Sequence, residues 1–315
     1  MSGSAWVNLA LEKLSCSQKE LAIRLGVSPT QISKWKNDEH MSYQMEDNFR
    51  ELTGIGDKYP QFVLWAGSLE NADKWERIVS ELADLAVDSA ETGYDTAPLS
   101  DDLAQLCWGT FYTLEQMGVA VPRAFPSELE RLAKGEADDE DFELAMANPY
   151  AHLISRIYKA LNDVYGFYVA YVYELTNDDQ LDLLETGMEI ESSLMDLAAS
   201  KLDVSTDLAP NFSNFRYETL KAYEEWVGSV KTAALRFGVP VRAELLDLVR
   251  KGHDELGFNA EAESLGVNES RIHPDIYMNE LLVGMRALHQ VLPVIVKKLG
   301  ITPEELKFDV SKLSS

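Results

Sequence analysis

The chain has 315 residues, 46% of them hydrophobic, so it can bury a sizeable core and is too long for one small domain. Its 53 acidic side chains outnumber its 28 basic ones and give a formal net charge of −25. No apolar stretch reaches the ~20 residues that span a bilayer, and the N-terminus lacks the layout of a secretory signal. Cys16 and Cys107 form neither a metal pattern nor a disulfide framework. We therefore expect a cytoplasmic protein with no membrane contact.

The charge is unevenly distributed along the chain. Residues 1–60 hold seven basic and eight acidic side chains, whereas the remaining 255 residues hold 21 basic and 45 acidic ones. An acidic body of this kind stays soluble and repels nucleic acid. Any contact with DNA is therefore expected within about the first 60 residues.

The stretch QKELAIRLGVSPTQISKWKND, residues 18–38, predicts two short helices joined by a tight turn. Ser17 and Glu20 have the spacing of a capping box at the start of the first helix. Leu21 and Ala22 begin its apolar face, and the small Ala22 allows a second helix to cross closely. Gly26 permits the left-handed backbone that ends a helix.

The second helix of this stretch has signals of its own at both ends. Ser28 is a suitable cap, and Pro29 suits the first helical position because no N–H group is needed there. Ile32 and Trp35 supply a buried face, and Asn37 and the residue after it end the helix. The spacing predicts a helix over Pro29–Lys36.

These residues resemble the helix-turn-helix of the phage-repressor family, the Cro-like or XRE-type domain. The match consists of Gln-x-x-Leu-Ala, Leu-Gly-Val-Ser and Ile-Ser-x-Trp between Gln18 and Asn37. Helices expected at Ala5–Leu14 and Tyr43–Leu52 extend the resemblance to roughly residues 4–56. The resemblance implies that the helix Pro29–Lys36 lies in the major groove of DNA.

The resemblance also implies a set of DNA-contacting residues, which are Gln18, Lys19, Ser28, Pro29, Thr30, Ser33, Lys34, Lys36 and Asn37. Among them, Lys34 could donate to guanine, and Thr30 could touch a thymine methyl group or a phosphate. Pro29 departs from the family pattern, which often places a hydrogen-bonding side chain at that position.

The outward positions Pro29, Thr30, Ser33 and Lys34 are expected to face base edges, whereas four other residues of the set are expected to contact phosphates. Gln18 matches the family position that binds a phosphate, and Lys19, Lys36 and Asn37 could do the same by charge or by amide donation. One such domain reads a single half-site, and its few basic residues imply modest affinity. Specific binding therefore calls for a homodimer on double-stranded DNA.

From about Gln61 onward the pattern is helical almost throughout, with no sustained strand pattern, so the fold class is predicted to be all-α. Three long segments carry apolar residues on one side: Trp75, Ile78, Leu82 and Leu85; Tyr150, Ile154, Ile157, Leu161, Tyr165, Tyr168 and Val172; and Leu281, Met285, Leu288, Leu292 and Ile295. We expect the tyrosine-rich stripe to be core, with phenol groups that reach the surface, and not a ligand box.

The body also has the pattern of an internal duplication of a three-to-four-helix unit. Four landmarks recur in the same order, which are Asp84-Leu85-Ala86 with Asp196-Leu197-Ala198, Ala97-Pro98 with Ala209-Pro210, Gly118-Val119 with Gly238-Val239, and Asn148-Pro149 with His273-Pro274. The predicted domains are thus 1–58, 59–176 and 177–315. The seam between the two copies is the expected cleft for a small ligand or a protein partner. Arg156 and Lys159 could meet an anionic ligand there, but the favoured interpretation is that they bridge to nearby acidic side chains on the surface.

Signals for catalysis or metal binding are weak. No phosphate-binding loop, nucleophile elbow or metalloprotease motif is present in the sequence. The run GEADDEDFE, residues 135–143, is expected to be a solvated loop, and Asn177-Asp178 is expected to cap the following helix. His253 lies beside Asp254 and Glu255, but nothing near it in the sequence completes a metal site. We therefore expect no metal and no cofactor.

The leading hypothesis is a sequence-specific DNA-binding transcriptional regulator of bacterial or phage type, whose acidic all-α body dimerises and receives a signal. The alternative is a protein-interaction module of the antitoxin, phage-defence or counter-defence kind. In that module the acidic body captures a basic protein and the N-terminal domain only targets or autoregulates. An enzyme is the third option, for which Tyr165, Tyr168, Arg156 and His152 are the only candidates.

Overall fold

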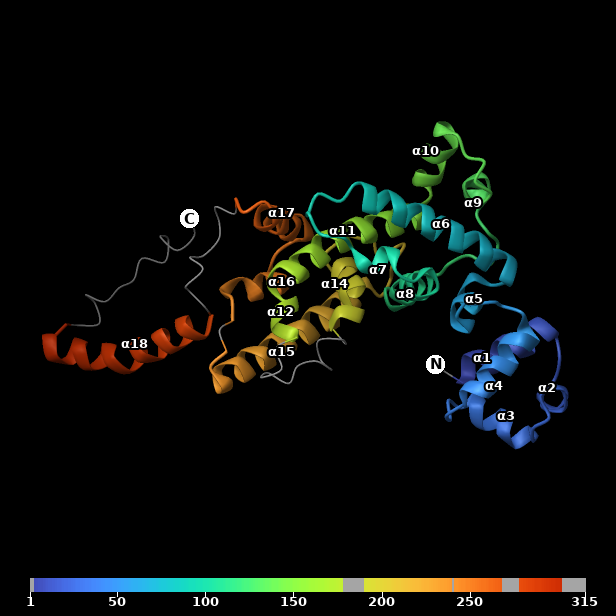
Figure 1. The fold of residues 1–315 in the computed structure, drawn as a ribbon, viewed down its shortest axis with the longest axis horizontal. Coiled ribbons are helices and arrows are strands. Elements are labelled where there is room, and N and C mark those ends of the chain that lie inside the picture. The colour runs from blue at the N-terminus through green and yellow to red at the C-terminus, as the bar shows by residue number, and fades with distance from the viewer. Residues whose placement is uncertain (1–2, 178–189, 240, 268–277, 302–315) are drawn as a thin grey trace.

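The computed structural model describes residues 3–177, 190–239, 241–267 and 278–301 (Figure 1). Helices and the turns between them make up these residues, and no strand occurs within the described ranges. The predicted all-α fold class is therefore confirmed. None of the helices in the same ranges is long and apolar enough to cross a membrane.

The N-terminal part folds around a small aromatic core. Its helices are α1 (Gly3–Leu14), α2 (Gln18–Leu25), α3 (Pro29–Lys36), α4 (Tyr43–Thr53) and α5 (Pro60–Ala66). Trp6, Leu21, Ile32 and Phe49 are fully buried, and the ring of Trp35 meets Phe49 edge-on at 6.0 Å between centroids. The helix boundaries predicted for this region agree with these bounds to within two residues.

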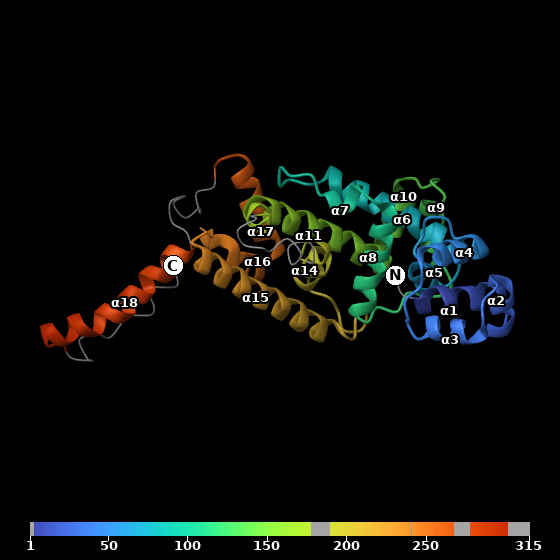
Figure 2. The same cartoon turned by 60° about the horizontal axis from the view of Figure 1, so that its bottom comes forward.

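The remaining elements form an elongated body. They are α6 (Leu69–Asp88), α7 (Ala97–Ser100), α8 (Leu103–Gln116), the 3₁₀ turn η1 (Ser127–Leu129), α9 (Glu130–Ala133), α10 (Asp139–Ala147), α11 (Pro149–Tyr171), α12 (Tyr173–Thr176), α14 (Leu194–Ser200), α15 (Phe212–Phe237), the 3₁₀ turn η2 (Ala243–Leu246), α16 (Asp247–Arg250), α17 (His253–Ser264) and α18 (Met278–Leu299). The N-terminal helices and α18 lie at opposite ends of the molecule in both ribbon views (Figures 1 and 2).

Helix α11 is the centre of the body. It packs against α6, α10, α14 and α17, and most of its side chains are buried. Two hydrogen bonds fix its position, from Asn162 Nδ2 to the Ala86 carbonyl oxygen at 2.6 Å and between the hydroxyl groups of Tyr158 and Thr110 at 2.6 Å. The tyrosine-rich stripe is therefore packed core, as predicted.

Helix α5 connects the N-terminal helices to the body. It packs on α1 on one side and on α6 and α8 on the other. Phe62 of α5 is buried and meets Phe111 of α8 edge-on at 4.8 Å between ring centroids. The apolar core consequently runs without interruption from the N-terminal helices into the body.

Two sequence-based predictions for the body are wrong, and a third falls on residues that the structure does not describe. Residues 135–143 are not simply a loop, because Asp138 and Asp141 form a capping box and α10 starts at Asp139. Acidic residues in a first turn interact favourably with the helix dipole, so the acidic run favours a helix there. Asn177 caps the C-terminus of α12, and the helix that Asn177-Asp178 was predicted to cap would begin in residues 178–189, which lie outside the described residues. Leu85 is exposed, and Ala86 takes the buried position instead.

Part of the element order recurs in the two predicted copies, although α7 has no described counterpart between α14 and α15. A 3₁₀ turn and a single α-turn occur in each, as η1 with α9 and as η2 with α16. Gly118 and Gly238 both have left-handed φ angles, of 81° and 71°, and the valine after each donates its N–H back to the preceding helix. This order is what a duplication would produce, and the duplication itself stays a prediction. Its landmark His273-Pro274 lies outside the described residues.

Lys201, which follows α14, provides a test of the packing. Its ammonium group donates to the Lys251 carbonyl oxygen at 2.7 Å, and burial lowers the pKa of Lys201 to about 8. At a pH between this value and about 10.4, which is the pKa of an exposed lysine, Lys201 carries a proton in the unfolded chain but not in the folded chain. The free energy of unfolding should therefore rise with pH across this window.

Urea unfolding of the wild type and of Lys201→Met at pH 7.5, 8.5 and 9.5 measures this effect. The wild type should gain stability relative to the variant as the pH rises, because only the wild type carries the buried amine. A constant difference between the two proteins across the three pH values would contradict the assignment.

Candidate nucleic-acid interface

Helix α2 begins and ends as its sequence predicts. The Ser17 side chain accepts from the Glu20 backbone N–H at 3.3 Å, and the Glu20 carboxylate accepts from the Ser17 N–H at 2.8 Å. These hydrogen bonds hold the pKa of Glu20 below its ordinary value. At the other end Gly26 adopts a left-handed φ of 67° and turns the chain into α3. Ala22 is buried where α2 meets the core.

Helix α3 follows after a short turn. Ser28 is in extended backbone, and its hydroxyl oxygen accepts from the Gln31 N–H at 3.2 Å. Pro29 occupies the first turn, where its missing N–H costs nothing. Ile32 and Trp35 are buried against α1 and α4, so the opposite side of α3 faces solvent.

The predicted DNA-contacting residues lie around this solvent-facing side. Lys19, Ser28, Pro29, Thr30, Ser33, Lys34, Lys36 and Asn37 are exposed, and Gln18 is half-buried. Gln18 and Ser33 are brought together, since the Ser33 hydroxyl lies 3.4 Å from Gln18 Oε1 and also donates to the Pro29 carbonyl oxygen at 3.2 Å. This contact joins the start of α2 to the middle of α3. Asn37 caps the C-terminus of α3.

Lys34 has a partner that the sequence analysis missed. Its ammonium group forms an ion pair with Glu39 at 3.2 Å, and both side chains are about half exposed. Glu39 reaches Lys34 because the chain turns back at Asp38, whose φ is 61°. An exposed pair of this kind is weak, so Lys34 can exchange Glu39 for another acceptor. The sequence held one signal for this ion pair, because Glu39 follows Lys34 by five positions and lies just beyond the predicted end of the helix.

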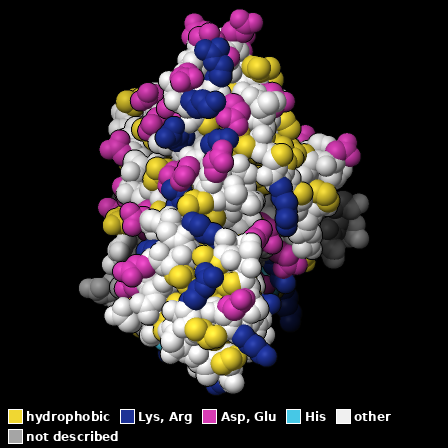
Figure 3. Space-filling model, turned by 90° about the vertical axis from the view of Figure 1, so that its right-hand side faces the viewer, with side chains coloured by type: hydrophobic (Ala, Val, Ile, Leu, Met, Phe, Trp, Pro, Cys, Tyr) yellow, Lys and Arg dark blue, Asp and Glu magenta, His cyan; other side chains and the backbone are white. Residues whose placement is uncertain are grey.

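The surface at this end of the molecule is not uniformly basic. Figure 3 views the molecule from the end that carries the N-terminal helices and shows Lys and Arg side chains interspersed with Asp and Glu. Few phosphate contacts are available on such a surface, so any affinity for DNA has to be modest and sensitive to salt.

The residues considered for catalysis do not form a site. Tyr165 and Tyr168 are buried in the core, where burial raises the pKa of Tyr165 to about 12 and that of Tyr168 in the same direction. Phenols with such values stay protonated at neutral pH. His152 is exposed in the first turn of α11, where its backbone N–H donates to the Asn148 carbonyl oxygen at 2.9 Å.

His253 has a partner on another element. Its Nδ1 atom lies 2.7 Å from an Asp163 carboxylate oxygen of α11 and 3.3 Å from Asp254. The three groups could hold a metal ion, since their ligand atoms lie within 4.8 Å of one another. The sequence analysis missed Asp163 because it is 90 positions away. The pair also explains how α17 is attached to α11, which requires no ion.

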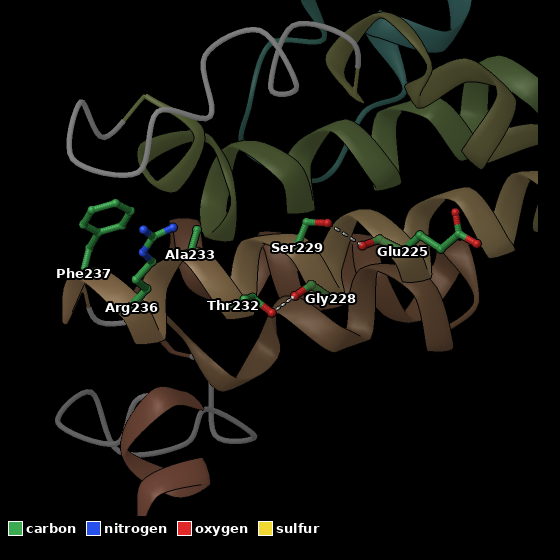
Figure 4. A pocket seen from close by; sticks show the side chains of 7 residues that line it. All are labelled: Glu225, Gly228, Ser229, Thr232, Ala233, Arg236 and Phe237. Atoms are coloured by element: carbon green, nitrogen blue, oxygen red, sulfur yellow. Dashed lines mark hydrogen bonds between the residues drawn. The ribbon is translucent and has the colours of Figure 1, made fainter.

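One depression in the body is formed by the surface of a single helix. Figure 4 shows its lining residues, Glu225 to Phe237, along one side of α15. The hydroxyl groups of Ser229 and Thr232 donate to backbone carbonyl oxygens of the same helix. These groups are therefore already satisfied by the helix, and the depression has no described opposite wall.

No family model, curated protein or solved structure matches this chain. Arguments about function therefore depend on the residues and their geometry.

The cap at Ser28 gives a test that is independent of DNA. Ser28→Ala removes the acceptor for the Gln31 N–H and should destabilise the first turn of α3 by about 1 kcal/mol. Hydrogen exchange of those amides should then be about fivefold faster. Ser33→Ala, on the same exposed side, is the matched control and should change exchange little. Equal effects of the two substitutions would contradict the capping role.

Proposed function

We propose that the protein is a sequence-specific DNA-binding transcriptional regulator. The observation that carries the proposal is the geometry of α2 and α3. Both helices are capped as the phage-repressor resemblance implies, and Ile32 and Trp35 are buried so that Thr30, Ser33 and Lys34 point away from the core. A helix held in this way can enter the major groove with its polar side toward the bases.

The proposed contacts divide into two kinds. Lys34 and Thr30 read base edges from the middle of α3. Gln18, Lys19 and Lys36 bind phosphates on either side of the groove and set the register of the domain. Ser28, Pro29, Ser33 and Asn37 shape the two ends and the surface of α3, a role supported by the capping and side-chain hydrogen bonds described above.

A homodimer is part of this proposal, and α18 is the surface proposed for it. Among the residues that the structure describes, its main contact is with α15, through the half-buried Leu282. The side chains of Leu281, Met285, Leu288, Leu292, Ile295 and Leu299 are 43–68% exposed. An apolar row of this length is unusual on a monomer.

The spacing of this row favours another copy of the same helix as its partner. The six residues are separated alternately by four and three positions, which is the heptad repeat of a coiled coil. Pro293 lies outside the row. A period of 3.5 residues keeps one seam facing a second helix along its whole length, whereas a globular core requires no such regularity.

The exposed area of this apolar row, called the α18 seam from here on, suits a reversible dimer. A fully exposed apolar side chain presents about 60–120 Å² to solvent. With the exposed fractions given above, the six residues and Val291 together expose about 300 Å² of apolar surface. Interfaces are about 60% apolar, so each copy would bury about 500 Å² in all. The total of about 1,000 Å² lies at the lower end for specific interfaces. The dimer should therefore form in a concentration-dependent way.

The orientation of the pair follows from the position of α18. It lies at the end of the molecule opposite α1–α4 and points away from the body (Figures 1 and 2). A parallel pairing places both N-terminal domains on the same side of the dimer, whereas an antiparallel pairing places them at opposite ends. Since two half-sites lie on one DNA, the proposal requires the parallel pair.

The alternative function is a protein-interaction module with the same fold. The observation that favours it is the Lys34–Glu39 ion pair, because an acidic residue beside the reading helix opposes DNA binding. The acidic body would then capture a basic partner. The regulator requires the solvent-facing residues of α3, whereas the protein-interaction module functions without them.

Selection of DNA from a random pool, followed by binding measurements, tests the regulator. Lys34→Ala should weaken binding to the selected sequence by about 1–3 kcal/mol and relax specificity at one position, while Lys19→Ala should weaken binding to all sequences and reduce the salt dependence. Glu39→Gln should strengthen binding by roughly two- to fivefold, because it removes a charge that competes for Lys34 and repels phosphate. Lys221→Ala, on exposed α15, is the matched control.

Failure to enrich any sequence with a folded protein would contradict the regulator and favour the interaction module. Equal losses in the Lys34 and Lys221 variants would show that general charge, and not α3, causes the binding.

Sedimentation velocity over a range of protein concentrations tests the α18 pair. Leu288→Asp with Leu292→Asp places charges in the seam and should give a monomer at concentrations where the wild type is dimeric. Gln290→Asp with His289→Asp, on the same helix but outside the seam, adds similar charge and should leave the dimer intact. A monomeric wild type, or a dimer insensitive to the seam variant, would exclude this surface as the interface.

A further inference from the structure

A second cavity lies in the body, between α7 and α8 on one side and the start of α14 on the other. Its volume is about 580 Å³, within the range of small-molecule sites. Its walls are formed by Ala97, Pro98, Asp101, Asp102, Gln105, Leu106, Trp108, Gly109, Tyr112, Thr113 and residues 191–196. Residues 97–113 belong to the first predicted copy and residues 191–196 to the second, so the cavity lies at the predicted seam.

One wall of the cavity is aromatic. The rings of Trp108 and Tyr112, one turn apart on α8, are stacked at 5.1 Å between centroids with an interplanar angle of 16°. Tyr59 lies against Trp108 at 6.0 Å, and its hydroxyl donates to Gln105 Oε1 at 2.9 Å. These contacts fix the aromatic wall in place without filling the cavity, so an apolar group can pack on it.

The rest of the polar lining is acidic. Asp101, Asp102, Glu191 and Asp196 line the cavity, and none of its described lining residues is basic. None of these four carboxylates forms an ion pair with a described residue, although Asp102 caps α8 and Asp196 accepts from the Thr113 hydroxyl at 2.6 Å. An apolar cavity that gathers one sign of charge attracts the opposite charge.

Asp101 and Asp102 are exposed, whereas Glu191 is half-buried, as is Asp196. Burial raises the pKa of the Asp196 carboxyl group, and the Thr113 hydroxyl only partly offsets this effect. The same carboxylate, together with Glu115, adds to the effect of burial in raising the pKa of Tyr112. No basic side chain of the described residues lowers either pKa, and a cationic ligand would supply such a charge.

We propose that this cavity binds a small organic cation, an alkylammonium or guanidinium compound with an apolar part. The cation lies among Asp101, Glu191 and Asp196, and the apolar part packs on Trp108 and Tyr112. The aromatic rings add a favourable interaction with the charge itself. The site replaces the anionic ligand that Arg156 and Lys159 suggested, since neither residue lines the cavity. It does not depend on the proposed DNA-binding function.

Calorimetric titration of the full chain with phenethylammonium tests the site, at about 0.15 M salt so that weak attraction to the acidic surface is screened. The neutral 2-phenylethanol is the probe without charge. We expect saturable binding of the cation and binding at least tenfold weaker of the alcohol.

Two matched variants separate the cavity from the general acidity of the body. Asp101→Asn with Glu191→Gln removes two charges from the cavity and should weaken binding of phenethylammonium at least tenfold. Asp203→Asn with Glu218→Gln removes two charges from exposed positions elsewhere and should leave binding unchanged. Thermal unfolding of each variant verifies that it is folded, and Trp108→Leu supplies a further loss of binding from the aromatic wall.

Three outcomes would overturn the proposal. These are no saturable binding of phenethylammonium to the wild type at millimolar concentration, equal affinity for the alcohol, and equal weakening in the two charge variants. The last result would assign the attraction to the net charge of the body.

Discussion

The burial of α11 is the constraint on which the rest of the body depends. This helix of 23 residues has neighbours from both halves of the chain, with α6 and α10 on one side and α14 and α17 on the other. Two of its buried hydrogen bonds, made by Asn162 and Tyr158, fix its rotation and its height against α6 and α8. Polar groups buried in this way cost free energy unless they keep these partners. The cavity and both ends of the molecule are positioned relative to this one helix.

Under the predicted duplication, the central position of α11 would account for the exposure of α18. In the predicted duplication α18 is the counterpart of α11, so it would be expected to pack on α14 and α17. Those helices are already covered by α11. The apolar seam of α18 therefore has no described partner of its size within the same chain. Helix α11 thus contacts elements of both predicted copies, and α18 is the long helix proposed to pair with another molecule.

Much of the fold could be predicted from the sequence, because the signals are local. The caps at Ser17 and Ser28, the turn at Gly26 and the apolar spacing of α11 act within a few residues of each other. The exposure of the apolar row of α18, the Asp163–His253 pair and the acidic lining of the cavity were missed, since each depends on which distant segments meet. Glu39 is an intermediate case, in which a short reversal at Asp38 brings a nearby charge onto the predicted reading surface.

Tyr59 connects the wall of the cavity to the helix that packs on the N-terminal helices. It stands at the start of α5, which packs on α1, and its ring and hydroxyl touch Trp108 and Gln105 in the cavity wall. The wall of the cavity and the helices that carry α3 therefore share one packed helix, α5, within a single continuous core.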